Sequence, residues 1–212
     1  MVAEPSQADQ TEMFKVIKKQ APNAIYYCLQ GQITTFIVSL LGSSPNIANL
    51  GALTRFAIIF TIVQTAFQNL YVPHFAKCQS RKGLTLLYFK ILGGFLVIAS
   101  VPFLLLVLFP KAFLGILGAQ YNHLGHDLVF AGLASVLSAA AGLLSMLNQA
   151  RAWVLPSTAY IGISILSVVI VAPIVDWNTI RGVLLFQIAI VIPLLPLQVY
   201  RTMKGLKTVS LE

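Results

Sequence analysis

The sequence predicts an all-α integral membrane protein, a bundle of six transmembrane helices. Of the 212 residues, 58% are hydrophobic, 9% are charged and the mean hydropathy is +0.84, whereas about 25% of the residues of a soluble domain are charged. The apolar residues come in runs near the roughly 20 residues that a helix needs to cross a hydrocarbon core of about 30 Å. They do not alternate as barrel strands do. The chain is therefore predicted to cross the membrane as helices.

Six apolar runs are bounded by glycine, proline, asparagine, serine or charged residues, which mark turns and interfaces. The predicted spans are 21–42, 47–76, 84–109, 128–149, 158–176 and 183–200. Residues 1–20 are predicted to be a polar segment with a short amphipathic helix on the membrane surface, and residues 201–212 a basic cytoplasmic tail. Short connections predict antiparallel neighbours and one six-helix domain over residues 21–200.

The placement of lysine and arginine predicts that both ends of the chain lie in the cytoplasm. Positively charged loops are retained on the cytoplasmic side of a membrane. With the amino end inside, all but three of the 14 Lys and Arg residues fall on the inner side, and the exceptions are Arg55, Lys111 and Arg181. An even number of spans then returns the carboxyl end to the cytoplasm.

Polar residues at helical spacing mark two candidate faces of a substrate pathway. The first face, in the first span, holds Asn23, Tyr27, Gln30 and Thr34, and the second face, in the second span, holds Thr61, Gln64 and Gln68. Residues three, four, seven and eleven positions apart share one side of a helix. Buried amides without partners are costly in hydrocarbon, so each face either joins helices or lines a wet cavity.

Arg55 is the most costly residue in any predicted span, and an arginine at membrane depth indicates a functional site. On an ideal helix it points about 140–180° away from Gln64 and Gln68. The run that contains it is longer than the roughly 20 residues of a single crossing. Two interpretations therefore stay open: Arg55 contacts the substrate, or its side chain snorkels to the outer interface.

Small residues recur along the fourth predicted span. They are Ala131, Ser135 and Ala139, spaced by four, and Ser138 and Gly142, also spaced by four. Small side chains let helix backbones approach closely in a membrane, so this span is predicted to pack closely against its neighbours.

Several classes of function have little support in the sequence. The net charge of +8 resides in short clusters between apolar runs, so no nucleic-acid partner is expected. His123, His126 and Asp127 have an i, i+3 spacing but no further ligand nearby, so we expect no metal site, cofactor or catalytic centre. Deep in the spans there is no Asp or Glu for proton or sodium coupling. We therefore expect a protein that is not an enzyme.

The stretch GQITTFIVSLLGSSPNIANLGALTRFAIIFTIVQTAFQNLYVPHFAK, residues 31–77, resembles bacterial oligosaccharide flippases, the exporters of lipid-linked O-antigen and related polysaccharide units. FPKAFLGILGAQYNHL, residues 109–124, is similar to the segment before the tenth helix of such flippases. The later helices fit their order. These flippases share a superfamily with multidrug and toxin extrusion (MATE) transporters, which pair two six-helix bundles around a cavity that opens alternately to each side.

The resemblance covers only the second of those bundles, and so implies one half of a MATE-like flippase fold in the bacterial inner membrane. It implies a half-length transporter for lipopolysaccharide and O-antigen synthesis, which moves an undecaprenyl-pyrophosphate-linked oligosaccharide between leaflets beside a second bundle or a second copy. Arg55 matches a basic residue in the family's eighth helix, where cationic residues hold the pyrophosphate. The predicted substrate-binding residues are Arg55, Gln30, Asn23, Thr34, Gln64 and Gln68. A non-transporting assembly partner of polysaccharide synthesis and half of a multidrug-type antiporter stay open as alternatives.

Overall fold

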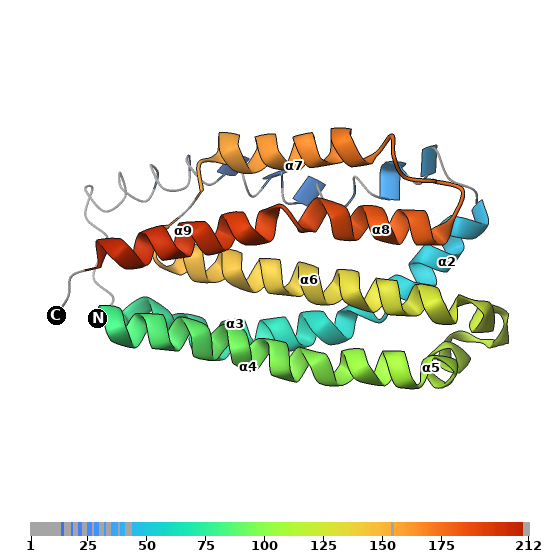
Figure 1. Ribbon diagram of the computed structural model, residues 1–212, viewed down its shortest axis with the longest axis horizontal. Helices are drawn as coiled ribbons and strands as arrows, with labels where there is room; N and C mark the ends of the chain where they lie inside the picture. Colours follow the sequence, from blue (N-terminus) through green and yellow to red (C-terminus); the bar gives the residue numbers. More distant parts are fainter. Residues whose placement is uncertain are drawn as a thin grey trace.

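The computed structural model describes residues 44–153 and 155–209, with scattered positions between 14 and 40. Every regular element in these residues is helical, and most helices run along the long axis of the molecule (Figure 1). The helices are α2 (Ser44–Thr54), α3 (Ala57–Lys77), α4 (Arg81–Leu108), α5 (Pro110–Leu117), the 3-10 helix η1 (Ala119–Leu124), α6 (Gly125–Ala150), α7 (Ser157–Val171), α8 (Ile180–Val191) and α9 (Leu194–Thr208). The predicted all-α class is confirmed for this part of the chain.

Four helical stretches in the described residues are long and apolar enough to cross a membrane. They are Ile47–Lys77, Arg81–Leu108, Ala119–Ala150 and Ile180–Thr208. They coincide with the second, third, fourth and sixth predicted spans, so the prediction of a multi-pass helical membrane protein is confirmed. The fifth predicted span corresponds to α7, which has only 15 residues. Most of the first predicted span and of segment 1–20 lies outside the described residues, so the count of six spans stays a prediction.

Two of the predicted spans are interrupted in the structure. Arg55 and Phe56 form a turn between α2 and α3, and Phe56 is buried with its ring edge-on to Phe113 of α5, at 5.8 Å between centroids. The second interruption separates α8 from α9 at Ile192 and Pro193. Pro193 has no N–H to donate to the preceding turn, which weakens the helix at this point.

The last helix continues past residue 200, where the sequence predicts that a basic tail begins. α9 runs to Thr208 because its final turns pack on the bundle: Thr202 and Leu206 are buried. Gly205 is also buried, and a side chain there would collide with the Trp153 ring. The basic residues of 201–208 therefore lie on a packed helix.

Helix α6 is the centre of the bundle and packs against α3, α4, α8 and α9. Its small residues permit this, as the sequence predicts: Ala131, Ala139 and Gly142 are buried. At Gly132 an added Cβ would lie 3.3 Å from Phe103 and Leu106 of α4. Small side chains thus bring α6 close to its neighbours.

Apart from Lys90, which is exposed within α4, the charged residues of 44–209 lie toward the two ends of the bundle. We define the basic end, where α3, α6 and α9 end and α4 begins, by Lys77, Arg81, Lys82, Arg151, Arg201, Lys204 and Lys207 (Figure 1). Hydrogen bonds from Arg151 Nε to the Phe75 carbonyl (3.0 Å) and from Arg201 Nε to the Trp153 carbonyl (3.4 Å) join these helix ends. The two carboxylates of the described residues, Asp127 and Asp176, lie at the opposite end.

Candidate substrate-binding cavity

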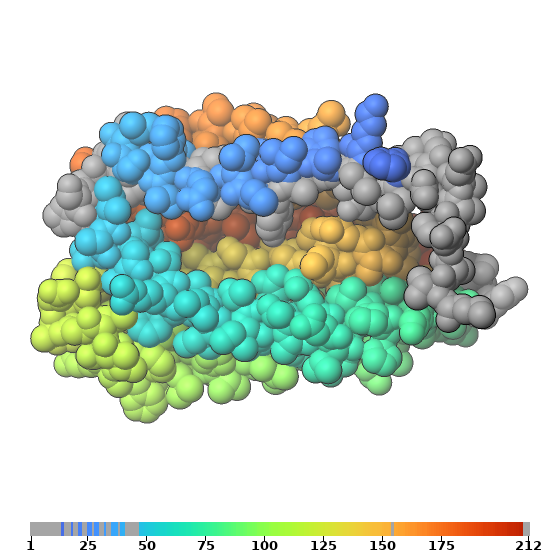
Figure 2. Space-filling view, turned by 180° about the vertical axis from the view of Figure 1, so that it is seen from behind, coloured from blue at the N-terminus to red at the C-terminus, as the bar shows by residue number. Residues whose placement is uncertain are grey.

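A cavity of about 710 Å³ lies between α2 and α3 on one side and α6, α8 and α9 on the other. Figure 2 looks into this hollow, with α6 and α8 visible beyond α3. Its polar lining consists of Thr35, Thr54, Thr61, Gln64, Ser135, Ser138, Ser145, Tyr160, Gln187 and Gln198. The remaining lining is aliphatic. None of the described lining residues carries an ionised group, and residues 20–54 contain no Asp, Glu, Lys, Arg or His in the sequence.

The Gln64 amide reaches the cavity because α6 has no side chain at Gly142. A Cβ at that glycine would meet the amide of Gln64, with the Gln64 Cδ at 3.1 Å. The close approach of α3 and α6 therefore places the Gln64 donor and acceptor at the cavity wall.

Two hydroxyl groups of the cavity wall already donate hydrogen bonds within their own helices. The Thr61 hydroxyl donates to the Ala57 carbonyl (3.1 Å), and the Ser135 hydroxyl donates to the Ala131 carbonyl (2.7 Å). Each hydroxyl oxygen then keeps lone pairs with which to accept a hydrogen bond. The amides of Gln64 and Gln187 add N–H donors. The wall thus offers both donors and acceptors without charge.

Gln198 belongs to a buried polar network toward the basic end. Its side chain is 6% exposed. Asn148 Nδ2 donates to Gln198 Oε1 (2.9 Å) and to the Gln198 carbonyl (3.1 Å), and the Thr202 hydroxyl lies 2.8 Å from Asn148 Oδ1 and 3.0 Å from the Gln198 carbonyl. The network holds α9 against α6.

The structure brings some of the predicted site residues to the cavity and not others. Gln64 lines it together with Thr61, whereas Gln68 is half-buried and is not among the lining residues. Asn23, Gln30 and Thr34, with Tyr27, lie outside the described residues. Their neighbour Thr35 is in the lining.

Arg55 is exposed, in the turn between α2 and α3, and is not among the lining residues. The 21 residues of α3 rise about 31 Å by themselves, which equals the thickness of the hydrocarbon core. Because α3 reaches the basic end at Lys77, we expect Arg55 to lie near the opposite interface. This placement favours the snorkelling interpretation of its charge.

Gln187, Gln198 and Ser145 are lining residues that we did not identify from the sequence. A signal was present for the two glutamines, because they are eleven positions apart in an apolar run and eleven residues make about three helical turns. Ser135 and Ser138 were noted for packing alone, and they also line the cavity.

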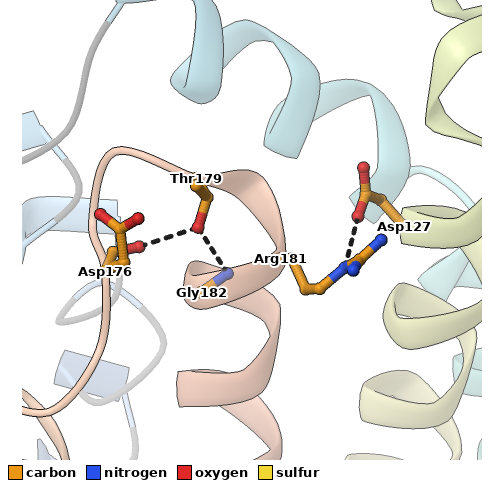
Figure 3. A network of polar contacts seen from close by, with 5 residues as sticks. All are labelled: Asp127, Asp176, Thr179, Arg181 and Gly182. Atoms are coloured by element: carbon orange, nitrogen blue, oxygen red, sulfur yellow. Dashed lines mark hydrogen bonds and ion pairs between the residues drawn. The ribbon is translucent and has the colours of Figure 1, made fainter.

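At the opposite end, an ion pair joins the beginnings of α6 and α8. Arg181 Nε lies 3.7 Å from Asp127 Oδ1 (Figure 3). The guanidinium also lies over the Phe130 ring, at 5.7 Å from its centroid. The Thr179 hydroxyl accepts from the Gly182 N–H and donates to the Asp176 carbonyl, both at 3.2 Å. These contacts fix the start of α8 beside α6. In the described residues, no three His, Cys, Asp or Glu side chains are grouped closely enough to hold a metal ion.

Comparison with known proteins found no matching family model, no matching curated protein and no matching solved structure. The resemblance of residues 31–77 and 109–124 to oligosaccharide flippases therefore stays a prediction. What the structure adds to it is a cavity of defined size, position and chemistry.

Proposed function

We propose that this bundle forms one wall of a pathway that moves a lipid-linked oligosaccharide across the bacterial inner membrane during polysaccharide synthesis. The observation that carries the proposal is the uncharged cavity of about 710 Å³, lined by amides and hydroxyls between α2–α3, α6 and α8–α9. Its volume lies within the roughly 300–1,000 Å³ typical of small-molecule sites.

The chemistry of the lining suits a sugar. A sugar carries hydroxyls that both donate and accept hydrogen bonds, and the lining offers amides such as Gln64 and hydroxyls such as Thr61 and Ser135. An unpaired pyrophosphate would lose its hydration in such an uncharged space at high cost. We therefore assign the glycan to the cavity and the anionic pyrophosphate to the interface, where Arg55 lies.

The distribution of charge supports an orientation for this pathway. The basic end is assigned to the cytoplasm, because positive charge is retained there. The carboxyl end, which follows α9 at the basic end, is then cytoplasmic, and the predicted first span assigns the amino end to the same side. The other wall of the pathway is assigned to a second six-helix bundle or a second copy, because transporters of this kind move one bundle against another around a central site.

The proposal is tested by binding, which needs no second bundle. The chain in lipid nanodiscs is titrated with an undecaprenyl-pyrophosphate-linked oligosaccharide, and with undecaprenyl pyrophosphate that lacks sugar. The sugar-bearing probe is expected to bind more tightly, and Gln64→Leu to reduce its affinity by about threefold to tenfold, the effect of one lost hydrogen bond.

Gln68→Leu is the matched control, because it changes the same residue type one turn along α3, outside the lining. It is expected to leave the affinity unchanged. Equal affinity for the two probes, or equal losses in the two variants, would refute the proposal and leave a membrane assembly partner as the function.

A further inference from the structure

A second groove, of about 390 Å³, lies on the surface at the beginning of α4. It is lined by Arg81, Lys82, Thr85, Leu86 and Phe89. These residues occupy positions i, i+1, i+4, i+5 and i+8 of α4. They therefore share one side of the helix, over slightly more than its first two turns. The groove therefore has two cations at one edge and two large apolar side chains at the other.

The groove spans the membrane interface. The 28 residues of α4 rise about 42 Å, about 12 Å more than a hydrocarbon core. The far end of α4, residues 103–108, contains only apolar side chains, so the surplus length lies at the start. Arg81 and Lys82 are then at headgroup level, and Phe89, 53% exposed, lies about 12 Å further along α4, where the hydrocarbon layer begins. Leu86, 57% exposed, lies between these two levels.

Neither cation at this groove forms an ion pair with a carboxylate of the residues that the structure describes. The one ion pair in the described part of the chain, between Arg181 and Asp127, lies at the opposite end. The remaining carboxylate of that part, Asp176, is there too. Lys77, four residues before Arg81, adds to the positive charge at this end.

We propose that this groove binds one anionic phospholipid of the leaflet at the basic end. The order of side chains along α4 matches the order of chemical groups along a lipid. The phosphate lies at Arg81 and Lys82, where a guanidinium donates two parallel hydrogen bonds to phosphate oxygens. The first carbons of an acyl chain lie against Leu86 and Phe89. The site is separate from the substrate cavity and does not depend on its function.

The test is the affinity of the purified full-length chain for single lipids, measured by native mass spectrometry with phosphatidylglycerol and phosphatidylcholine. Phosphatidylglycerol is expected to bind more tightly. R81Q/K82Q is expected to lower its affinity about tenfold or more, since each basic residue near a membrane surface contributes about fivefold. The affinity for phosphatidylcholine is expected to stay unchanged.

K204Q/K207Q is the matched control, because it removes the same charge from exposed positions on α9 at the same end. It is expected to change the affinity for phosphatidylglycerol by less than about twofold. The charge-conserving variant R81K/K82R is expected to have an equally small effect. If R81Q/K82Q does not fold, Lys82→Gln alone, at an exposed position, is compared with Lys204→Gln.

Three outcomes would overturn the proposal. The first is an equal loss of phosphatidylglycerol affinity in R81Q/K82Q and K204Q/K207Q, which would indicate that only the total charge matters. The second is an unchanged affinity in R81Q/K82Q. The third is displacement of phosphatidylglycerol by an equal concentration of inorganic phosphate. Loss of sugar-probe binding by Gln64→Leu would not affect it, so the two proposals fail separately.

Discussion

Gln64 of α3 occupies the space that a side chain at Gly142 of α6 would fill. This relationship couples the packing of the two helices to the chemistry of the cavity. The absence of a side chain at Gly142 therefore decides where the Gln64 amide lies.

Gly142→Ala is therefore expected to displace the Gln64 amide and to lower the affinity for the sugar-bearing probe as far as Gln64→Leu does. The cost in folding free energy is expected near 1 kcal/mol, the lower end of the range for overpacking, because the end of a glutamine side chain can move. Gly93→Ala is the control, since no atom lies within 4 Å of its added Cβ. A normal affinity in Gly142→Ala would show that the position of Gln64 does not matter for binding.

Gly182→Ala is expected to destabilise the protein more than Gly142→Ala. An added Cβ at Gly182 would collide with the Asp176 carbonyl, a backbone atom that cannot turn aside, so the loop before α8 must shift (Figure 3). We expect a loss of about 2 kcal/mol or more. Thermal unfolding of both variants in the same detergent measures the difference, and a smaller effect at Gly182 would contradict the prediction.

Thr202→Val is expected to cost about 1–3 kcal/mol, because it removes a donor from the buried Asn148 Oδ1. The side chain of Thr202 is 0% exposed, so water does not replace the hydroxyl. Thr208→Val, at the exposed end of α9, is expected to cost less than about 0.5 kcal/mol. Unfolding in a denaturing detergent compares the two, and equal losses would rule out a stabilising role for the network.

Cys78 is expected to face the cytoplasm, because it lies between Lys77 and Arg81 at the basic end. In a Cys28→Ser background, a membrane-impermeant thiol reagent is expected to label Cys78 only after the cells are permeabilised. A cysteine introduced at exposed Gln120, at the opposite end, is expected to react in intact cells in a Cys28→Ser, Cys78→Ser background. The reverse pattern would invert the orientation of the bundle.

Arg55→Ala is expected to weaken binding of the pyrophosphate-linked probe and to spare a probe with the same glycan on an uncharged lipid. Arg55→Lys is expected to retain part of the binding, because the charge remains although the bidentate geometry is lost. Titration of the three proteins with both probes in nanodiscs measures this. If the wild type and both variants bind the pyrophosphate-linked probe with equal affinity, Arg55 does not contact the substrate and its side chain only snorkels to the interface.

The sequence by itself determined the class of the protein and the positions of its longest helices. A helix satisfies every backbone N–H and C=O internally, so long apolar runs in a membrane protein have few other conformations available. Gln64 was identified in the same way, because its polar face repeats with the helical period. The small residues of 131–142 likewise predicted close packing, and Ala131, Ala139 and Gly142 are buried.

Only the tertiary structure decided which polar residues share a cavity. Helical spacing states which residues share a face but not which neighbour covers that face. Gln64 lines the cavity and Gln68 does not, although the sequence groups both in one arc. Gln187 and Gln198 lie on either side of the break at Pro193 and reach the same cavity because α8 and α9 both pack on α6. Arg55 is placed near an interface by the turn that ends α2, and no local rule in the sequence predicts that turn.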